Sequence, residues 1–259
     1  MNISEGRDRA VVDEIAAQAG PALLDVHADA DHHRSVLTMV GEDAPRAVAA
    51  AAVVHLDLRS HHGAHPRIGV VDVVPFVALS GSVPADALRA RDRFSRWAAA
   101  ELDLPCFRYG PRRSLPEIRR RAFVGLEPDD GPPTPHPTAG AAAVGARPPM
   151  VAYNLWLAEP DLARARELAA DLRGPAVRAL GLAVGTHVQV SMNLLAPAEV
   201  GPASVADAVA GQVAVERCEL VGLVPADVLF QVPHGRWAEL DLGQDRTIEA
   251  QIEQARVRR

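Results

Sequence analysis

Apolar and polar positions alternate in a regular order along the second half of the chain. Short apolar runs bounded by turn residues predict strands over residues 150–157, 177–184, 187–195 and 219–224. Apolar residues at helical spacing predict helices over residues 161–172 and 204–217, with Asp161 and Ser204 as N-caps. The resulting order, β-α-β-β-α-β, is the ferredoxin-like plan.

The first half follows the same order without its first element. Helical spacing predicts helices over residues 7–19, 44–58, 84–102 and 114–121. Apolar runs predict strands over residues 23–27, 35–40, 70–79 and 106–109. Only six residues precede Arg7, so the sequence predicts a first unit that lacks its N-terminal strand. An upstream extension of the natural chain, another segment or another subunit then fills that place.

These patterns predict an α+β fold, an α/β sandwich of two ferredoxin-like subdomains over residues 1–147 and 148–259. A segment dense in proline and glycine, residues 127–145, lies at the end of the first subdomain. Its composition fits a flexible linker and an ordered loop over a cleft equally well, so both interpretations stay open.

Composition narrows the class of protein. The chain has 259 residues, of which 48% are apolar and 4% aromatic, as in soluble globular domains. No run approaches the ~18 apolar residues of a membrane span, and the N-terminus lacks the apolar core of a signal peptide, which predicts a cytoplasmic protein. Cys106 and Cys218 lie far apart, which argues against a disulfide framework or a thiolate zinc site.

Charge excludes further classes. All 27 basic residues are arginine, so the chain has neither a Schiff-base lysine nor the lysine of a Walker-type phosphate loop. A net charge of −6 without a basic stripe argues against nucleic acid as a partner. The sequence therefore predicts a protein without nucleic-acid or membrane partners.

Histidine is concentrated in two short segments. Seven of the ten histidines lie there: His27, His32 and His33 close to Asp29 and Asp31, and then His55, His61, His62 and His65. Imidazole and carboxylate ligands suit zinc, manganese or iron, but the HExxH spacing is absent. Histidines in polar surface loops explain the clusters equally well. A metal-dependent hydrolase is therefore a minor hypothesis, and no metal site is predicted.

The segment 61–76, HHGAHPRIGVVDVVPF, is more informative. A polar loop with Gly63 and Pro66 leads directly into a strongly apolar strand. This order places His65 and Arg67 at the start of a buried element, where a general acid/base beside an anion-binding guanidinium is useful. The segment is therefore a candidate site on physical grounds alone.

Five motifs follow one another along nearly the whole chain. NxSEG lies at residues 2–6, HxGxHPRxGxxDVxPF at 61–76, DxGPxxxxPxxGxxxxGAR at 129–147, QVSxNL at 189–194 and LVGLVP at 220–225. In these motifs and their order the sequence resembles the glutamate formiminotransferase (glutamate formimidoyltransferase) family, as a formiminotransferase domain without a cyclodeaminase domain. The HPRxGxxDVxPF segment is the specific part of the match.

The resemblance implies transfer of the formimino group from N-formimino-L-glutamate to N5 of tetrahydrofolate, a step of histidine degradation and one-carbon metabolism. His65 is implied as the catalytic proton donor and acceptor, and residues 131–140 as the folate-contacting loop of the N-terminal subdomain. The substrate- and folate-binding residues that the resemblance implies are Asp25, His27, Arg34, Arg67, Gly131, Pro132, Pro133, Thr134, Pro135, His136, Pro137, Thr138, Ala139, Gly140, Arg147 and Asn193.

The implied partners are small molecules. Tetrahydrofolate enters as a co-substrate, no metal is implied, and arginines such as Arg67 and Arg147 suit the carboxylates of the donor and of the folate tail. A preference for polyglutamylated folate and a homodimeric assembly are left open. Two ferredoxin-like subdomains are the fold that the resemblance implies.

The sequence departs from the family pattern at five positions. His27 stands where the family has a second aspartate, His33 replaces an asparagine, Ala64 a glutamate, Ala139 a tryptophan and Val144 a threonine. A neutral imidazole does not replace a carboxylate as an ion-pair partner at pH 7, and alanine offers no aromatic surface to a ring. An alternative is therefore a divergent folate-binding relative with lost or altered transferase activity.

Overall fold

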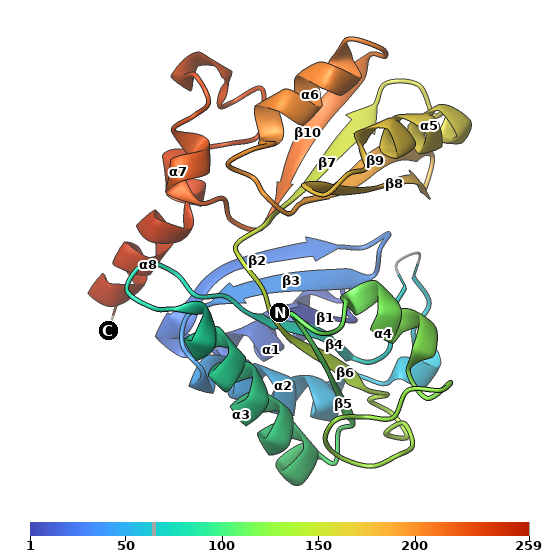
Figure 1. The fold of residues 1–259 in the computed structure, drawn as a ribbon, viewed down its shortest axis with the longest axis vertical. Coiled ribbons are helices and arrows are strands. Elements are labelled where there is room, and N and C mark those ends of the chain that lie inside the picture. The colour runs from blue at the N-terminus through green and yellow to red at the C-terminus, as the bar shows by residue number, and fades with distance from the viewer. Residues whose placement is uncertain (64–65, 259) are drawn as a thin grey trace. The chain divides into compact units, whose positions relative to one another are not determined.

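Two β-sheets organise the chain. The computed structural model describes residues 1–63 and 66–258, and Met1–Pro148 and Pro149–Arg259 form separate units that are described one at a time (Figure 1). The first unit contains a six-stranded sheet and the second a four-stranded sheet. The predicted α+β fold class is confirmed. In the described part of the chain no helix is long and apolar enough to cross a membrane.

The sheet of the first unit combines an antiparallel ferredoxin-like part with a parallel extension. Its strands, in spatial order, are β2 (Leu23–Asp29), β3 (Arg34–Met39), β1 (Asn2–Ile3), β4 (Val71–Phe76), β6 (Ala142–Ala146) and β5 (Cys106–Tyr109). The first four strands pair with one another in antiparallel orientation. β6 is parallel to both β4 and β5, so it extends the sheet beyond the ferredoxin-like plan.

The first strand is present, and the prediction that the first unit lacks it is wrong. β1 lies between β3 and β4, where Asn2 pairs with Val36 on one side and Val73 on the other. The side chain of Ile3 is fully buried in the core. A strand of two residues, one of them polar, is too short to produce a periodic signal, which is why the sequence pattern does not reveal it.

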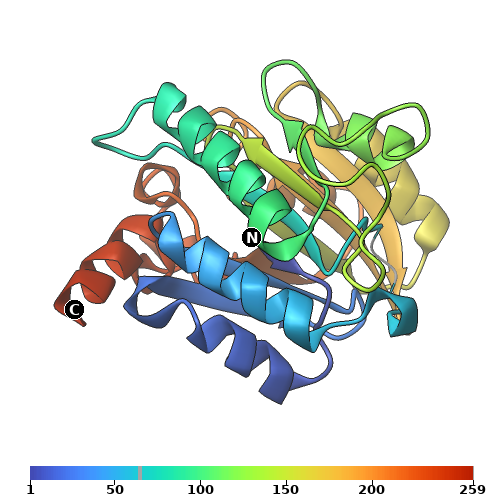
Figure 2. The same cartoon turned by 90° about the horizontal axis from the view of Figure 1, so that it is seen from below.

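Three helices cover one face of this sheet. They are α1 (Arg9–Ala17), α2 (Asp43–His55) and α3 (Pro84–Leu102), which lie side by side in Figure 2. The shorter α4 (Leu115–Arg121) lies on the opposite face, where Ile118 packs against Phe107 and Tyr109. Because side chains alternate along a strand, the polar residues of β2 and β3 that point away from α1–α3 share this opposite face.

The second unit is a complete ferredoxin-like unit. Its antiparallel strands, in spatial order, are β10 (Val215–Val221), β7 (Val151–Leu157), β9 (His187–Leu194) and β8 (Val177–Val184). Its helices are α5 (Leu162–Leu172), α6 (Pro202–Ala210), α7 (Ala226–Leu229) and α8 (Ile248–Val257). Asp161 caps α5, as predicted, by accepting a hydrogen bond from the backbone N–H of Arg164 at 2.9 Å.

The end of α6 differs from the prediction. The helix predicted to reach residue 217 stops at Ala210, and Val215–Val221 form β10. Gly211 follows the last helical residue. Glycine favours helix termination because its backbone loses more conformational entropy in a helix than that of other residues. Gly201 rather than Ser204 precedes the helix, with Pro202 as its first residue.

The proline- and glycine-rich segment 127–145 is part of the first unit, so the flexible-linker interpretation is wrong. The N–H of Asp129 donates to the carbonyl of Cys106 at 2.9 Å, and the N–H of Cys106 donates to the carbonyl of Asp130 at 2.9 Å. β6 begins within the segment, and its residues 142–144 are fully buried. Backbone hydrogen bonding therefore fixes the segment to the sheet of the first unit, beside β5 at its start and between β4 and β5 at its end.

Candidate active site

A buried aspartate organises charge on the face of the first sheet that α1–α3 leave uncovered. Asp72, in β4, accepts hydrogen bonds from Arg34 of β3 and from Nη2 of Arg119 of α4, the latter at 2.6 Å. The N–H of Ile68 donates to its Oδ1 at 2.8 Å. Burial raises the pKa of Asp72, but the two guanidinium groups lower it by more, so the net pKa lies below its ordinary value. Asp72, Arg34 and Arg119 are called the Asp72 cluster below.

Two further arginines from the predicted site lie near the Asp72 cluster. Arg67 interacts electrostatically with all three of its members. Arg147 hydrogen-bonds the hydroxyl of Tyr109, which itself interacts with Asp72. Burial lowers the pKa of Arg147 and raises that of Tyr109. The tyrosine ring lies over Gly145, where an added Cβ would be 2.0 Å from the ring. Guanidinium groups thus outnumber carboxylates, which suits an anionic ligand.

Arg67 also fixes the loop that leads into β4. Its guanidinium donates to Nδ1 of His61 and, at 2.5 Å, to the carbonyl of Gly63. Nε2 of His61 donates to the carbonyl of His33 at 2.8 Å, and the two imidazole rings stack with centroids 4.0 Å apart. Burial lowers the pKa of both histidines below the ordinary value, which favours the neutral form of both rings.

The NxSEG motif meets the same histidine pair. Oε1 of Glu5 accepts hydrogen bonds from the backbone N–H groups of residues 6–8 at 2.7–2.9 Å and lies 3.3 Å from Nδ1 of His33. Gly63 of the second motif has no room for a side chain, since a Cβ there would lie 2.5 Å from the carbonyl oxygen of His32. Two motifs that are distant in the sequence therefore pack on one β-turn region between β2 and β3.

The predicted folate loop, residues 131–140, is held in place by its own hydrogen bonds. His136 and Gly140 exchange two backbone hydrogen bonds of 2.8 and 3.0 Å, and Nδ1 of His136 accepts the N–H of Ala139 at 2.9 Å. The carbonyl of Ala139 accepts the N–H of Val70 at 2.9 Å. The loop is thus docked on the segment that precedes β4.

The side chains of this loop are mostly accessible. Exposed or half-buried members are Gly131, Pro132, Pro133, Thr134, Pro135, His136, Pro137 and Thr138. Ala139 and Gly140 are buried, and the N–H groups of residues 138 and 139 turn toward His136. The accessible part can contact a ligand, whereas the buried end anchors the loop.

The remaining predicted residues are placed as follows. Asp25 and His27 lie on one face of β2, and Arg34, which pairs with Asp29 across the hairpin, shares that face. The structure therefore brings Asp25, His27 and Arg34 to the same face as the Asp72 cluster. Asn193 lies on β9 of the second unit and is exposed. His65, like Ala64, lies outside the described residues.

Arg119 is the residue of this site that sequence reasoning missed. It belongs to the run Arg119–Arg121 at the end of α4, where three arginines resemble a solvated helix end. Only Arg119 reaches Asp72 and the carbonyl of Pro66, to which it donates at 2.5 Å. The buried neighbour Ile118 is the one local sign that this part of the helix faces inward.

The side chains that the structure describes favour anions over cations. Among them no group of three or more histidine, cysteine or acidic residues is arranged to hold a metal ion. The protein is therefore of the α+β class, with ferredoxin-like units and a guanidinium-rich cluster of side chains on its first sheet.

Comparison with known proteins gives the family. The profile of the formiminotransferase domain, N-terminal subdomain, matches residues 1–147. The glutamate formimidoyltransferase of Streptococcus pyogenes serotype M1 is 35% identical over 225 residues, which cover 75% of each chain. The glutamate formimidoyltransferase of Thermoplasma acidophilum is 34% identical over 74% of each chain. The formimidoyltransferase-cyclodeaminase of Sus scrofa is 33% identical over 88% of this chain, which spans half of the longer protein.

The chain belongs to the formiminotransferase family.

Proposed function

We propose that this protein is a glutamate formimidoyltransferase that acts in histidine degradation. It transfers the formimino group from N-formimino-L-glutamate to N5 of tetrahydrofolate and releases 5-formimino-tetrahydrofolate and L-glutamate. The family, and the names of two relatives that this chain covers over about three quarters of their length, support the reaction class. The guanidinium groups of the candidate site support substrates that carry carboxylates.

The observation that carries the proposal is the excess of guanidinium groups around Asp72. Arg34, Arg67 and Arg119 surround one carboxylate, which balances one of their three charges. Both proposed substrates carry carboxylates, and the planar guanidinium group binds a carboxylate through two parallel hydrogen bonds. Partial burial strengthens such contacts because the local dielectric constant is lower than that of water.

His65 is the proposed proton shuttle of the transfer. N5 of tetrahydrofolate attacks the formimino carbon and loses its proton, and the bond between that carbon and the glutamate nitrogen breaks as this nitrogen gains a proton. One imidazole that takes the first proton and returns it to the leaving nitrogen balances the reaction. The contacts of Arg67 with His61 and Gly63 hold the two ends of the loop in which His65 lies in the sequence.

The other proposed contacts follow from the same assignment. Arg34, Arg67 and Arg147 bind carboxylates, and residues 131–140 cover the folate. Asp25 and His27 contribute from β2, and Asn193 from β9. Tetrahydrofolate is a co-substrate in this scheme, and no step requires a metal.

A divergent folate-binding relative is the second candidate, favoured by Ala139. Its side chain is fully buried beneath the loop, so it presents no surface to an aromatic ring of the folate. A protein of this kind binds tetrahydrofolate but forms no 5-formimino-tetrahydrofolate.

The test is product formation by the full chain. We expect purified protein incubated with N-formimino-L-glutamate and tetrahydrofolate to form 5-formimino-tetrahydrofolate and L-glutamate in equal amounts, measured by chromatography. A parallel reaction with N-formyl-L-glutamate determines which donor is used. Tetrahydrofolate binding without product from the formimino donor would contradict the proposed transfer and support the second candidate.

A further inference from the structure

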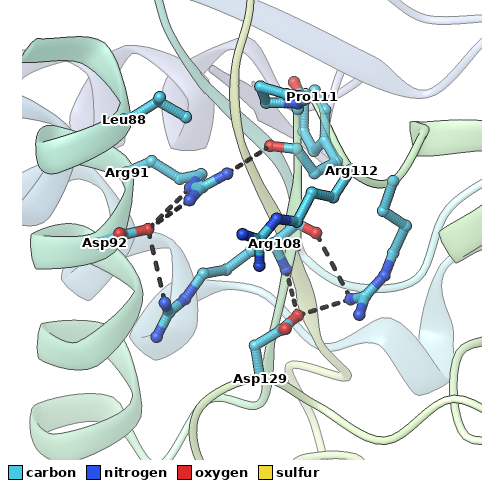
Figure 3. A pocket seen from close by; sticks show the side chains of 10 residues that line it. Leu88, Arg91, Asp92, Arg108, Pro111, Arg112 and Asp129 are labelled. Carbon is cyan, nitrogen blue, oxygen red and sulfur yellow. Dashed lines mark hydrogen bonds and ion pairs between the residues drawn. The ribbon is translucent and has the colours of Figure 1, made fainter. Parts of the chain in front are cut away.

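A polar pocket of about 560 Å³ lies in the first unit, between α3, β5 and the loop that leads to α4 (Figure 3). Its volume is that of a site for a small organic molecule. The charged residues that line it are Arg91, Asp92, Arg108, Arg112, Arg113 and Asp129. Six of the ten lining residues are charged, so the pocket can bind a charged group of a ligand.

Most of these charges are paired with one another. Arg91 binds Asp92, with Nη2 2.8 Å from the carboxylate. Arg113 binds Asp129 through its Nη1 at 2.7 Å. Asp130, just outside the pocket wall, pairs with Arg108. Three aspartates thus balance three arginines, and the fourth arginine decides the net charge of the pocket.

That fourth residue is Arg112. It is exposed on the loop between β5 and α4, and its guanidinium makes no hydrogen bond or ion pair within the part of the chain that the structure describes. Beside it, Arg113 uses only Nη1 in its bonds to Asp129 and to the carbonyl of Arg108. The pocket therefore offers the N–H donors of two arginines that are consecutive in the sequence, and one uncompensated positive charge.

The backbone around the pocket is well supported. β4, β6 and β5 run parallel, and the pocket lies at the carboxyl end of β5, the edge of a parallel sheet at which ligands commonly bind. Arg91 reaches from α3 to the carbonyl of Tyr109 at 3.2 Å, and the N–H of Gly110 donates to the carbonyl of Arg113 at 2.9 Å. The loop that presents Arg112 is thus fixed at its start.

We propose that this pocket binds a small organic anion through a carboxylate or phosphate group held by Arg112 and Arg113. Both groups present two or more oxygens to paired guanidinium N–H donors, which is the chemistry that the pocket offers. The bulk of the pocket accommodates the body of the ligand. No residue of the Asp72 cluster lines the pocket, although Tyr109 in its wall interacts with Asp72. The proposal does not depend on the proposed transfer reaction.

Calorimetric titration of the full chain tests the proposal, with inorganic phosphate and glutarate as separate probes at constant ionic strength. Arg112→Gln removes the unpaired charge, and Arg96→Gln is a matched control, since Arg96 is also exposed, lies on α3 and does not line the pocket. We expect saturable binding of at least one probe, weakened about tenfold or more by Arg112→Gln and unchanged by Arg96→Gln. The probe that binds identifies the anion group.

Hydrogen exchange locates the bound anion independently of the variants. In the unmodified protein, the binding probe should slow amide exchange in residues 108–113. No saturable binding below about 10 mM of either probe would overturn the proposal. Equal affinity of the Arg112→Gln and Arg96→Gln proteins, or unchanged exchange in residues 108–113, would overturn it as well.

Discussion

Asp72 is the residue on which the charge arrangement of the first unit depends. Arg34 and Arg119 both bind its buried carboxylate. The ion pairs between these three groups compensate the free energy lost when the groups are removed from water. Removal of the carboxylate leaves Arg34 and Arg119 facing one another without a counter-charge. The residue therefore has a larger influence on stability than any surface ion pair of this chain.

We predict that Asp72→Asn lowers the free energy of unfolding by about 3–5 kcal/mol, the range for a buried pair that loses one partner. Urea denaturation measures the change. Asp57→Asn is the matched control, because Asp57 forms an exposed ion pair with Arg59. This control should leave the unfolding midpoint nearly unchanged. Equal midpoints for the two variants would show that Asp72 does not have this role.

The same residue determines part of the acid sensitivity. The pKa of Asp72 is lower in the folded protein than in the unfolded chain, so its stabilising effect is complete above the ordinary aspartate pKa and is lost as the pH falls toward the folded value. The Asp72→Asn protein lacks this titration. Its stability should therefore decline less steeply than that of the unmodified protein below about pH 4.

At the scale of elements, the loop 131–140 joins two parts of the site. At its start, the backbone of Asp129 and Asp130 is hydrogen-bonded to Cys106 of β5. At its end, the carbonyl of Ala139 accepts the N–H of Val70, just before β4. Between these anchors the side chains are mostly accessible. A loop fixed at both ends and accessible in its centre can order further on binding a ligand without a large entropic cost.

We predict that tetrahydrofolate slows amide exchange in the centre of this loop. The N–H groups of Gly131 and Thr134 should gain protection, whereas those of His136, Ala139 and Gly140 are already hydrogen-bonded and should change little. The loop around Gly174 and Pro175 in the second unit serves as the control segment. Equal exchange at Gly131 and Thr134 with and without saturating tetrahydrofolate would contradict the assignment of this loop as a folate cover.

Elements with a strong local signal were predictable from the sequence. The pattern places α3 over residues 84–102 and β5 over 106–109, and the structure has the same bounds. A long amphipathic helix and a short apolar run between turn residues carry their own periodicity. The hairpin of β8 and β9 follows for the same reason.

Elements that depend on tertiary partners were not predictable. β1 has two residues and exists because β3 and β4 pair with it on both sides. β6 consists of small residues, AAVGA, that become a strand between two parallel neighbours. Arg119 was missed likewise, since its partner Asp72 is 47 residues away in the sequence. Arg34 was indicated only through the family resemblance, whereas the polar loop and apolar strand of residues 61–76 had already indicated Arg67.

At the scale of the whole molecule, two ferredoxin-like units have different tasks in this account. The first carries the parallel extension, the Asp72 cluster and the loop 131–140, and the second is a plain four-stranded unit with Asn193 on β9. We propose that the chain catalyses formimino transfer with His65 as the proton shuttle. The motif at residues 61–76 supports this choice of residue.

The most direct measurement is the rate of 5-formimino-tetrahydrofolate formation by the His65→Ala protein. His62→Ala is the matched control, because His62 is an exposed histidine of the same loop. We expect His65→Ala to lower the rate by about a hundredfold or more. Tetrahydrofolate binding and the circular dichroism spectrum should stay unchanged, and His62→Ala should remain active. A folded His65→Ala protein that forms product at nearly the unmodified rate would contradict the account.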